Sequence, residues 1–155
     1  MDRFQILENK GRNYFLNFLK QCRKVRNWFP TLDKYNYVDG FIDINEGRIV
    51  VEIKVRDSKY LNYPSHLMEL DKYMNLTKAK IDYNCLTGWY VNLFDSDTLY
   101  IYDLNKINSS NCKLVTRYVN ATTAEDNGKR LKQFLEIPVS FALKYKLKNN
   151  KWIKI

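Results

Sequence analysis

One stretch of the sequence, residues 38–56, constrains the fold more than any other. Apolar and polar residues alternate over residues 38–44, which predicts a half-buried strand. Residues 49–55 are rich in β-branched residues and almost continuously apolar, as in a strand covered on both faces. Between them, residues 45–47 have the composition of a tight turn, in which Gly47 can adopt a positive φ. The stretch therefore predicts a β-hairpin whose second strand lies inside a sheet.

Two charged residues, Glu52 and Lys54, interrupt this apolar second strand. Alternate residues of a strand share a face, so the two side chains lie about 7 Å apart on one face. A hairpin folded about residues 45 and 46 places Asp39 opposite Glu52, in a register that a bulge would change. Two close carboxylates repel each other unless a cation lies between them, and a few oxygen ligands with room for water suit Mg²⁺. Such a metal would stabilise charge on a phosphate, while Lys54 would hold the attacking water or stabilise the developing anion.

The same charges also suit a plainer arrangement, a surface hairpin with a cross-strand salt bridge. Glu52 and Lys54 would then face solvent, and Asp39 would only begin the turn region. The apolar residues around these charges leave no clearly solvated face, which favours the buried arrangement.

Asp39, followed by Glu52-Ile53-Lys54 at the end of the next strand, resembles the motif of the PD-(D/E)xK nuclease superfamily, in particular its small phage and bacterial endonucleases. Position 38 is a valine, so the proline of the nominal motif is missing. The resemblance implies an α/β (α+β) fold with a restriction-endonuclease-like core, in which helices flank a mixed central sheet. It also implies that Asp39 and Glu52 ligate Mg²⁺, for which Mn²⁺ can substitute, with the backbone carbonyl of Ile53 as a third ligand. Lys54 would position or activate the attacking water.

The helices expected on either side of the hairpin supply further candidates. Apolar residues recur at helical spacing over residues 3–28 and 65–80, which predicts a helix in each range. In the superfamily an N-terminal helix often carries a glutamate that reaches the metal site, which implies this role for Glu8. Residues 67–73 resemble the helix that follows the motif in phage and bacterial members of the superfamily, and this resemblance implies that Glu69 or Lys72 leans towards the same site. Otherwise Glu8 is a salt-bridge residue beside the apolar stripe, and Glu69 and Lys72 form an i,i+3 pair on a surface helix.

The remaining elements are predicted from the same periodicities. Residues 28–37 form a connector, in which Pro30 stops the first helix. After it we expect a second hairpin with strands over 87–94 and 97–104, a strand over 113–119, a helix over 122–135 and a final strand over 139–147. We expect one domain, with a nuclease-like core over about 1–105 and a basic C-terminal extension over about 106–155.

Gly11 lies on the apolar stripe of the first helix, where it either allows close packing or marks a break. The single histidine, His66, has no serine or cysteine partner at a recognisable spacing and is predicted to be a surface or capping residue.

The net charge of +9 favours an anionic partner, nucleic acid first. The candidate phosphate contacts are Arg12 and Arg23 on the first helix, Arg56 on the same strand face as Lys54, and Lys144 and Lys146 in the final strand. A solvated helix face and a solubilising tail are the alternatives for these charges. The three cysteines lack metal-ligand spacing and fit a reducing cytosol, and no apolar run is long enough to span a membrane. The expected location is the cytoplasm of a bacterial or phage-infected host cell.

Together these features predict a Mg²⁺-dependent nuclease that hydrolyses phosphodiester bonds in duplex or branched DNA, as a Holliday-junction resolvase or a recombination or packaging endonuclease. Two alternatives remain at the level of sequence. One is a nucleic-acid-binding module that keeps the fold and does not cut; the other is a basic structural or assembly protein with an acidic partner. The sequence leaves open the choice between DNA and RNA, the preferred structure, and whether a homodimer forms to cut both strands.

Overall fold

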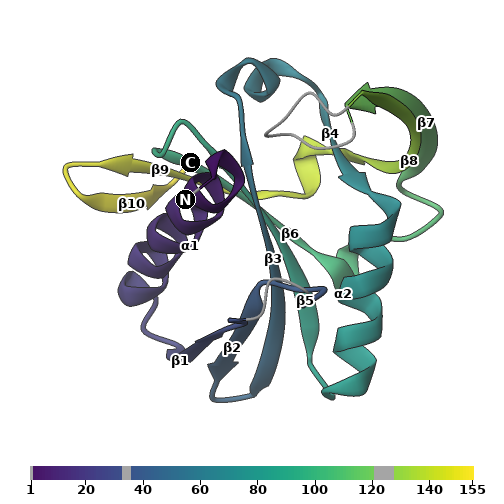
Figure 1. Ribbon diagram of the computed structural model, residues 1–155. Helices are drawn as coiled ribbons and strands as arrows, with labels where there is room; N and C mark the ends of the chain where they lie inside the picture. Colours follow the sequence, from purple (N-terminus) through teal and green to yellow (C-terminus); the bar gives the residue numbers. More distant parts are fainter. Residues whose placement is uncertain (1, 33–35, 121–127) are drawn as a thin grey trace.

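The computed structural model of the chain describes residues 2–32, 36–120 and 128–155. A seven-stranded sheet forms its centre, and two helices pack on opposite faces of that sheet (Figure 1). Its strands, in spatial order, are β1 (Val25–Pro30), β2 (Gly40–Ile44), β3 (Gly47–Arg56), β5 (Thr87–Phe94), β6 (Thr98–Asp103), β9 (Leu143–Lys148) and β10 (Lys151–Lys154). The sheet is mixed, because β3 and β5 are parallel while the other neighbours are antiparallel. The predicted fold class, a mixed central sheet flanked by helices, is confirmed.

A second, three-stranded antiparallel sheet lies beside the first. It consists of β4 (Ser65–Glu69), β8 (Lys129–Pro138) and β7 (Lys113–Asn120), in that order. Short 3₁₀ turns, η1 (Ser58–Asn62), η2 (Leu104–Lys106) and η3 (Val139–Phe141), link the elements. The chain after residue 105 therefore supplies strands to both sheets. No helix in the described ranges is both long enough and apolar enough to cross a membrane.

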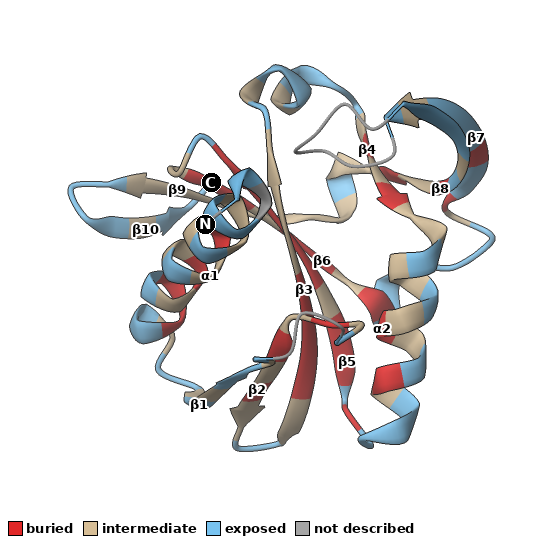
Figure 2. Cartoon of the chain, viewed as in Figure 1, coloured by how far each residue is buried: buried red, intermediate tan, exposed pale blue. Residues whose placement is uncertain are grey.

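The two helices each cover a separate apolar core. Helix α1 (Arg3–Gln21) begins at a capping box, in which Asp2 and Gln5 satisfy each other's backbone N–H groups. Its core includes Phe15, Phe18, Val51, Val91, Leu93 and Ile101. Helix α2 (Leu70–Asp82) covers the other face, over a core that includes Val50, Met68, Leu76, Tyr90, Tyr102 and Ile137. Figure 2 shows buried segments along the central strands, including β3 and β5, and on parts of both helices.

The central hairpin has the predicted register. Gly40 pairs with Val51 across β2 and β3, so the same count places Asp39 opposite Glu52. Gly47 ends the turn with φ +151°. The second predicted hairpin is also confirmed as β5 and β6, and both residues of its turn, Asp95 and Ser96, have positive φ values.

Gly11 allows close packing and does not break α1. A Cβ at this position would lie 3.0 Å from the Cγ2 atom of Val55 and 3.1 Å from that of Ile53. The helix therefore rests directly on the carboxyl-terminal half of β3. This contact brings the first half of α1, with Glu8 and Arg12, to the end of the hairpin that carries Asp39.

The first helix is shorter than predicted, because α1 ends at Gln21 and Cys22 has extended backbone angles. The prediction of helix to residue 28 is wrong, as is the connector over residues 28–30, since both fall on β1. This strand pairs with β2, and Trp28 packs its ring against the edge of Phe15 at 5.6 Å between centroids. Residues 33–35 of the predicted connector lie outside the described residues.

The second helix begins five residues later than predicted. Residues 65–69 form β4, in which His66 and Met68 are buried on one face. This strand pairs with β8, with Met68 opposite Leu135. Local periodicity did not reveal β4, because its partner lies almost 70 residues further along the chain.

The last third also departs from the predicted pattern. The helix over 122–135 is wrong for residues 129–135, which belong to β8, and residues 121–127 lie outside the described residues. The strand over 113–119 is confirmed as β7. The final strand is confirmed only from Leu143 onwards, because Val139–Phe141 forms the turn η3.

His66 is buried, so its predicted surface or capping role is wrong. Its Nδ1 atom lies 2.6 Å from the hydroxyl oxygen of Tyr102, and its Nε2 atom lies 3.1 Å from the backbone oxygen of Tyr60. A carbonyl oxygen can only accept, so Nε2 donates to Tyr60 and Nδ1 accepts from Tyr102. Burial lowers the pKa of His66 to about 4, and the ring is therefore neutral at neutral pH.

Candidate active site

Asp39 immediately precedes β2, and β3 extends past this point to Arg56. Its backbone N–H donates to the oxygen of Val51 at 2.9 Å, and its Oδ2 atom accepts from the backbone N–H of Ile53 at 2.7 Å. A strand residue directs its N–H and C=O to the same edge, so the carbonyl of Ile53 also faces this edge of β3. One carboxylate and one backbone carbonyl therefore meet at the edge where the β2 ladder starts.

Glu52 points to the α2 side of the sheet and is only 5% exposed. Lys72, in the first turn of α2, places its Nζ atom 2.7 Å from Oε1 of Glu52. Burial, and then the charge of Asp39, raise the pKa of Glu52 above its usual value, while the ammonium group of Lys72 opposes this shift and favours the ionised carboxylate. Burial works against the charge of Lys72, but Glu52, Asp39 and Glu69 together raise its pKa above the usual value. Of the two residues expected to lean towards this site, Lys72 makes direct contact.

Lys54 follows Glu52 on the same face of β3 and is partly buried. Burial lowers its pKa, and the nearby charges of Arg56 and Lys72 lower it further. Glu69 and Glu52 oppose this shift. The ammonium group of Lys54 therefore loses its proton more readily than that of an exposed lysine, which is a property of groups that exchange protons with water or substrate.

Helix α1 contributes an ion-pair bridge. The NH2 group of Arg12 lies 2.9 Å from Oε1 of Glu8 and 3.2 Å from Oδ1 of Asp39, and its NH1 group donates to the oxygen of Thr31 at 2.7 Å. The Nε atom of Arg12 is buried and has no hydrogen-bond partner among the described residues. Arg12 was predicted to bind nucleic acid, but in the structure it bridges the carboxylates of Glu8 and Asp39. We call Glu8, Asp39 and Glu52 the carboxylate cluster. Glu8 reaches the cluster through Arg12.

The donor set of this site fits a small divalent cation. The charge of Asp39 raises the pKa of Glu52, as expected of two carboxylates that lie near each other. A cation held by both would relieve the repulsion between them. Within the described ranges, no group of three or more histidine, cysteine, aspartate or glutamate side chains is placed to hold a metal. Two carboxylates and one backbone carbonyl are hard oxygen donors, the kind that Mg²⁺, completed by water, prefers over the ligands of softer metals.

Arg56 was predicted to contact nucleic acid, but its guanidinium group forms hydrogen bonds within the protein. It donates to the side chain of Asn92, to the backbone oxygen of Leu67 and, at 2.7 Å, to the hydroxyl oxygen of Tyr90. These bonds join the end of β3 to β4 and β5. Sequence reasoning missed Asn92 and Tyr90, although a fully buried asparagine within an apolar strand signals such a polar network.

The remaining predicted nucleic-acid contacts lie away from the carboxylates. Arg23 is exposed between α1 and β1. On β9, the Nζ atom of Lys144 lies 5.4 Å from the ring centroid of Tyr100, and that of Lys146 lies 2.8 Å from Oδ2 of Asp97. Lys144 and Lys146 are alternate residues on one face of β9, whereas Arg23 lies on a different segment, between α1 and β1.

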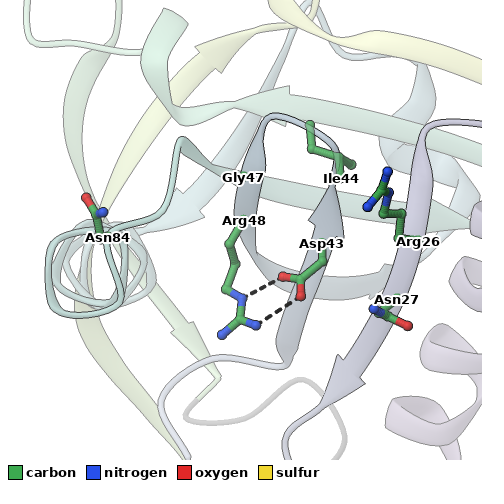
Figure 3. A pocket seen from close by; sticks show the side chains of 7 residues that line it. All are labelled: Arg26, Asn27, Asp43, Ile44, Gly47, Arg48 and Asn84. Atoms are coloured by element: carbon green, nitrogen blue, oxygen red, sulfur yellow. Dashed lines mark hydrogen bonds and ion pairs between the residues drawn. The ribbon is translucent and has the colours of Figure 1, made fainter.

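A pocket of about 440 Å³ lies at the opposite end of the hairpin, near its turn (Figure 3). Its lining comes from β1, β2, β3 and the segment after α2: Arg26, Asn27, Asp43, Ile44, Gly47, Arg48 and Asn84. Inside it, Arg48 forms two bonds to the carboxylate of Asp43, at 2.6 and 3.0 Å. This pair satisfies both charges, and the pocket includes none of the carboxylate cluster.

Comparisons with known proteins extend the description of the fold. The sequence matches no protein-family model and no curated protein. Among solved structures, the chain is similar to Hjc, a Holliday junction resolvase from the archaeal hyperthermophile Archaeoglobus fulgidus. The similarity has a TM-score of 0.50 and covers 84% of this chain and 88% of that chain, with 8% sequence identity. At this identity the likeness concerns the fold alone.

Proposed function

We propose that this chain is a Mg²⁺-dependent nuclease of the PD-(D/E)xK type that hydrolyses phosphodiester bonds in DNA. The observation that carries the proposal is the convergence of Asp39, Glu52 and Lys54 on one part of β3, with Lys72 ion-paired to Glu52. Metal ligation by Asp39, Glu52 and the carbonyl of Ile53 is part of the proposal. When bound there, Mg²⁺ would neutralise charge on the phosphate and lower the pKa of a coordinated water.

The protein's own residues then have separate tasks. Lys54, with its lowered pKa, holds the attacking water and accepts its proton or stabilises the phosphorane oxygen. Lys72 keeps the buried carboxylate of Glu52 compensated and oriented. Arg12 fixes one oxygen of Asp39, while the backbone N–H of Ile53 fixes the other. The carboxylates are therefore positioned before substrate arrives, which reduces the reorganisation needed during reaction.

Branched DNA is the substrate class we propose. The net charge of +9 suits a polyanion with several phosphates. The similarity of the fold to a Holliday junction resolvase supports a role in resolution or recombination rather than packaging. Exposed basic residues such as Arg23 would contribute the sequence-independent part of binding. A homodimer would present two such sites, one for each of two strands.

A second candidate function is a nucleic-acid-binding module that does not cut. The observation in its favour is that both carboxylates already have cationic partners within the chain, Lys72 for Glu52 and Arg12 for Asp39. A site that is compensated in this way is stable without metal. The two functions agree on DNA binding and differ on hydrolysis.

The test is a cleavage assay on supercoiled, linear, single-stranded and four-way-junction DNA, with Mg²⁺, Mn²⁺ or EDTA. We expect metal-dependent cutting, with the highest rate on the junction, and a loss of at least about a hundredfold in Lys54→Ala. Lys148→Ala, on the exposed end of β9, is the matched control and should cut as the wild type does. Salt-sensitive binding without cutting on any substrate would support the non-cleaving module. Absence of both binding and cutting would overturn both functions.

A further inference from the structure

Two exposed tyrosines lie beyond β3: Tyr60 in the turn η1, and Tyr63 immediately after it. Tyr60 is 36% exposed and Tyr63 is 53% exposed, and neither belongs to the apolar cores under α1 and α2. Their ring centroids lie 5.7 Å apart, with the planes tilted by 49°. The two rings therefore form one exposed aromatic surface, which we call the tyrosine pair.

The turn that carries the tyrosine pair is anchored on both sides. Asp57 accepts from the backbone N–H of Lys59 at 3.0 Å, and its own backbone oxygen accepts from that of Tyr60 at 3.1 Å. On the other side, buried His66 donates to the backbone oxygen of Tyr60, and the oxygen of Pro64 accepts from the N–H of Val139 at 3.0 Å. Aromatic rings held on a fixed backbone lose little conformational freedom when a ligand stacks on them.

The tyrosine pair continues the strand that carries the candidate active site. Figure 1 shows η1 as the short coil beyond the end of β3, and only Val55 and Arg56 separate Lys54 from Asp57. The rise over three residues of extended chain, from Lys54 to Asp57, is roughly 10 Å or about three base steps of DNA, and η1 carries the rings beyond that point. Arg56 ties this end of β3 to β4 through the oxygen of Leu67, so the spacing is fixed by the fold.

The charge beside the rings suits a polyanion. The Nζ atom of Lys59 lies 5.1 Å from the ring centroid of Tyr60, where the ammonium remains close to solvent. An exposed aromatic surface next to a lysine is the combination with which proteins bind single-stranded nucleic acid, because bases stack on the rings while the cation contacts phosphate. In a continuous duplex the bases are stacked on each other and are not available to such rings.

We infer that Tyr60 and Tyr63 stack on unpaired bases a few nucleotides from the phosphodiester held at Asp39 and Glu52. This inference rests on the proposed function and narrows its substrate class to DNA with unpaired bases next to the cut, as at a fork or at a branch point whose base pairs have opened. The rings contribute to binding and specificity and take no part in the chemistry.

The experiment measures binding in EDTA, so that no cutting is required. The probes are a duplex and a fork of the same length and sequence, each with 2-aminopurine at the position of the branch, and the readouts are anisotropy and 2-aminopurine fluorescence. For the Tyr60→Ala/Tyr63→Ala variant we expect fork affinity to fall about tenfold or more while duplex affinity stays within twofold. The Tyr60→Phe/Tyr63→Phe variant should retain fork affinity, because phenylalanine keeps the stacking surface.

Tyr83→Ala is the matched control, since Tyr83 is 51% exposed and lies at the far end of α2 from η1. It should leave both affinities unchanged. Thermal unfolding of each variant shows whether a loss of binding reflects a loss of folded protein. Equal losses on fork and duplex, no loss on the fork, or the same loss in the phenylalanine variant would each overturn the inference.

The inference and the proposed function fail in different ways. If the wild type cuts DNA with Mg²⁺ and the alanine variant keeps its preference for the fork, the inference is wrong and the nuclease proposal stands. If the wild type prefers the fork, loses this preference in the alanine variant and cuts nothing, the inference stands and the nuclease proposal fails.

Discussion

Lys72 and Glu52 join α2 to the central strand through an ion pair of 2.7 Å. Glu52 is almost fully buried, whereas Lys72 remains partly exposed and can move its ammonium group into solvent. The pair therefore holds a carboxylate in place without enclosing both charges. It also connects the start of α2 to β3.

We predict that Lys72→Met lowers the free energy of unfolding, because Glu52 is left buried without its partner. The coupling between the two residues should be about 1–2 kcal/mol, a range kept small by the solvent exposure of Lys72. Chemical denaturation of both single variants and of Glu52→Gln/Lys72→Met measures this coupling. Strictly additive effects would contradict a stabilising pair.

Arg56 should be required for stability and should contribute little to DNA affinity. Arg56→Lys keeps the charge but loses the planar set of donors that serves Asn92, Leu67 and Tyr90, so we expect a loss of about 2 kcal/mol in stability. Arg23→Lys, at an exposed position, is the matched control and should be neutral. If instead Arg56→Lys unfolds like the wild type and binds DNA more weakly, Arg56 faces the substrate.

Gly11 should not tolerate a larger side chain. Because a Cβ there already lies 3.0 Å from the Cγ2 atom of Val55, Gly11→Leu must displace α1 from β3, and we expect a loss of about 2 kcal/mol. The displacement would also move Arg12 away from Asp39. Asn13→Leu, on the exposed face of the same helix, controls for the added apolar surface and should change stability little. A larger loss of stability in Asn13→Leu than in Gly11→Leu would contradict the close packing of α1 on β3.

His66 should make stability depend on pH. Its pKa is about 4 in the folded protein and about 6.5 in the unfolded chain, so folding favours the neutral ring. This contribution is fully present above pH 6.5 and is lost as pH falls towards 4, by up to about 1.4 kcal/mol per pH unit. The measurement is the unfolding free energy of the wild type and of His66→Gln at several pH values. The difference between them should shrink in acid, and a constant difference would contradict the buried, neutral state.

The sequence was sufficient to predict those parts of the site that depend on local geometry. Alternation along β3 and a short turn determine which residue faces Glu52, and the register places Asp39 there. The resemblance of residues 67–73 to a superfamily helix implied that Glu69 or Lys72 leans towards the same place, and Lys72 contacts Glu52. The register spans few residues, so local periodicity describes it well.

Relationships between distant residues could not be predicted in this way. The strand β4 and the burial of His66 depend on β8, which lies far along the chain and has a weak strand pattern of its own. The internal role of Arg56 depends on Asn92 and Leu67, on two other strands. Arg12 was likewise interpreted as a surface cation, because its carboxylate partner Asp39 is 27 residues away in the sequence.

The most direct test of the candidate site is the nicking of supercoiled plasmid DNA by the wild type, Asp39→Asn and Glu52→Gln, each with Mg²⁺ and with EDTA. These two variants keep the shape of the side chains and remove the charge that would hold the metal. We predict nicking by the wild type that requires Mg²⁺, and a loss of at least about a hundredfold in both variants, while their DNA affinity in EDTA is retained. Nicking at the wild-type rate in either variant, or DNA binding by the wild type without any metal-dependent nicking, would contradict the assignment of Asp39 and Glu52 as the metal-binding pair of a nuclease.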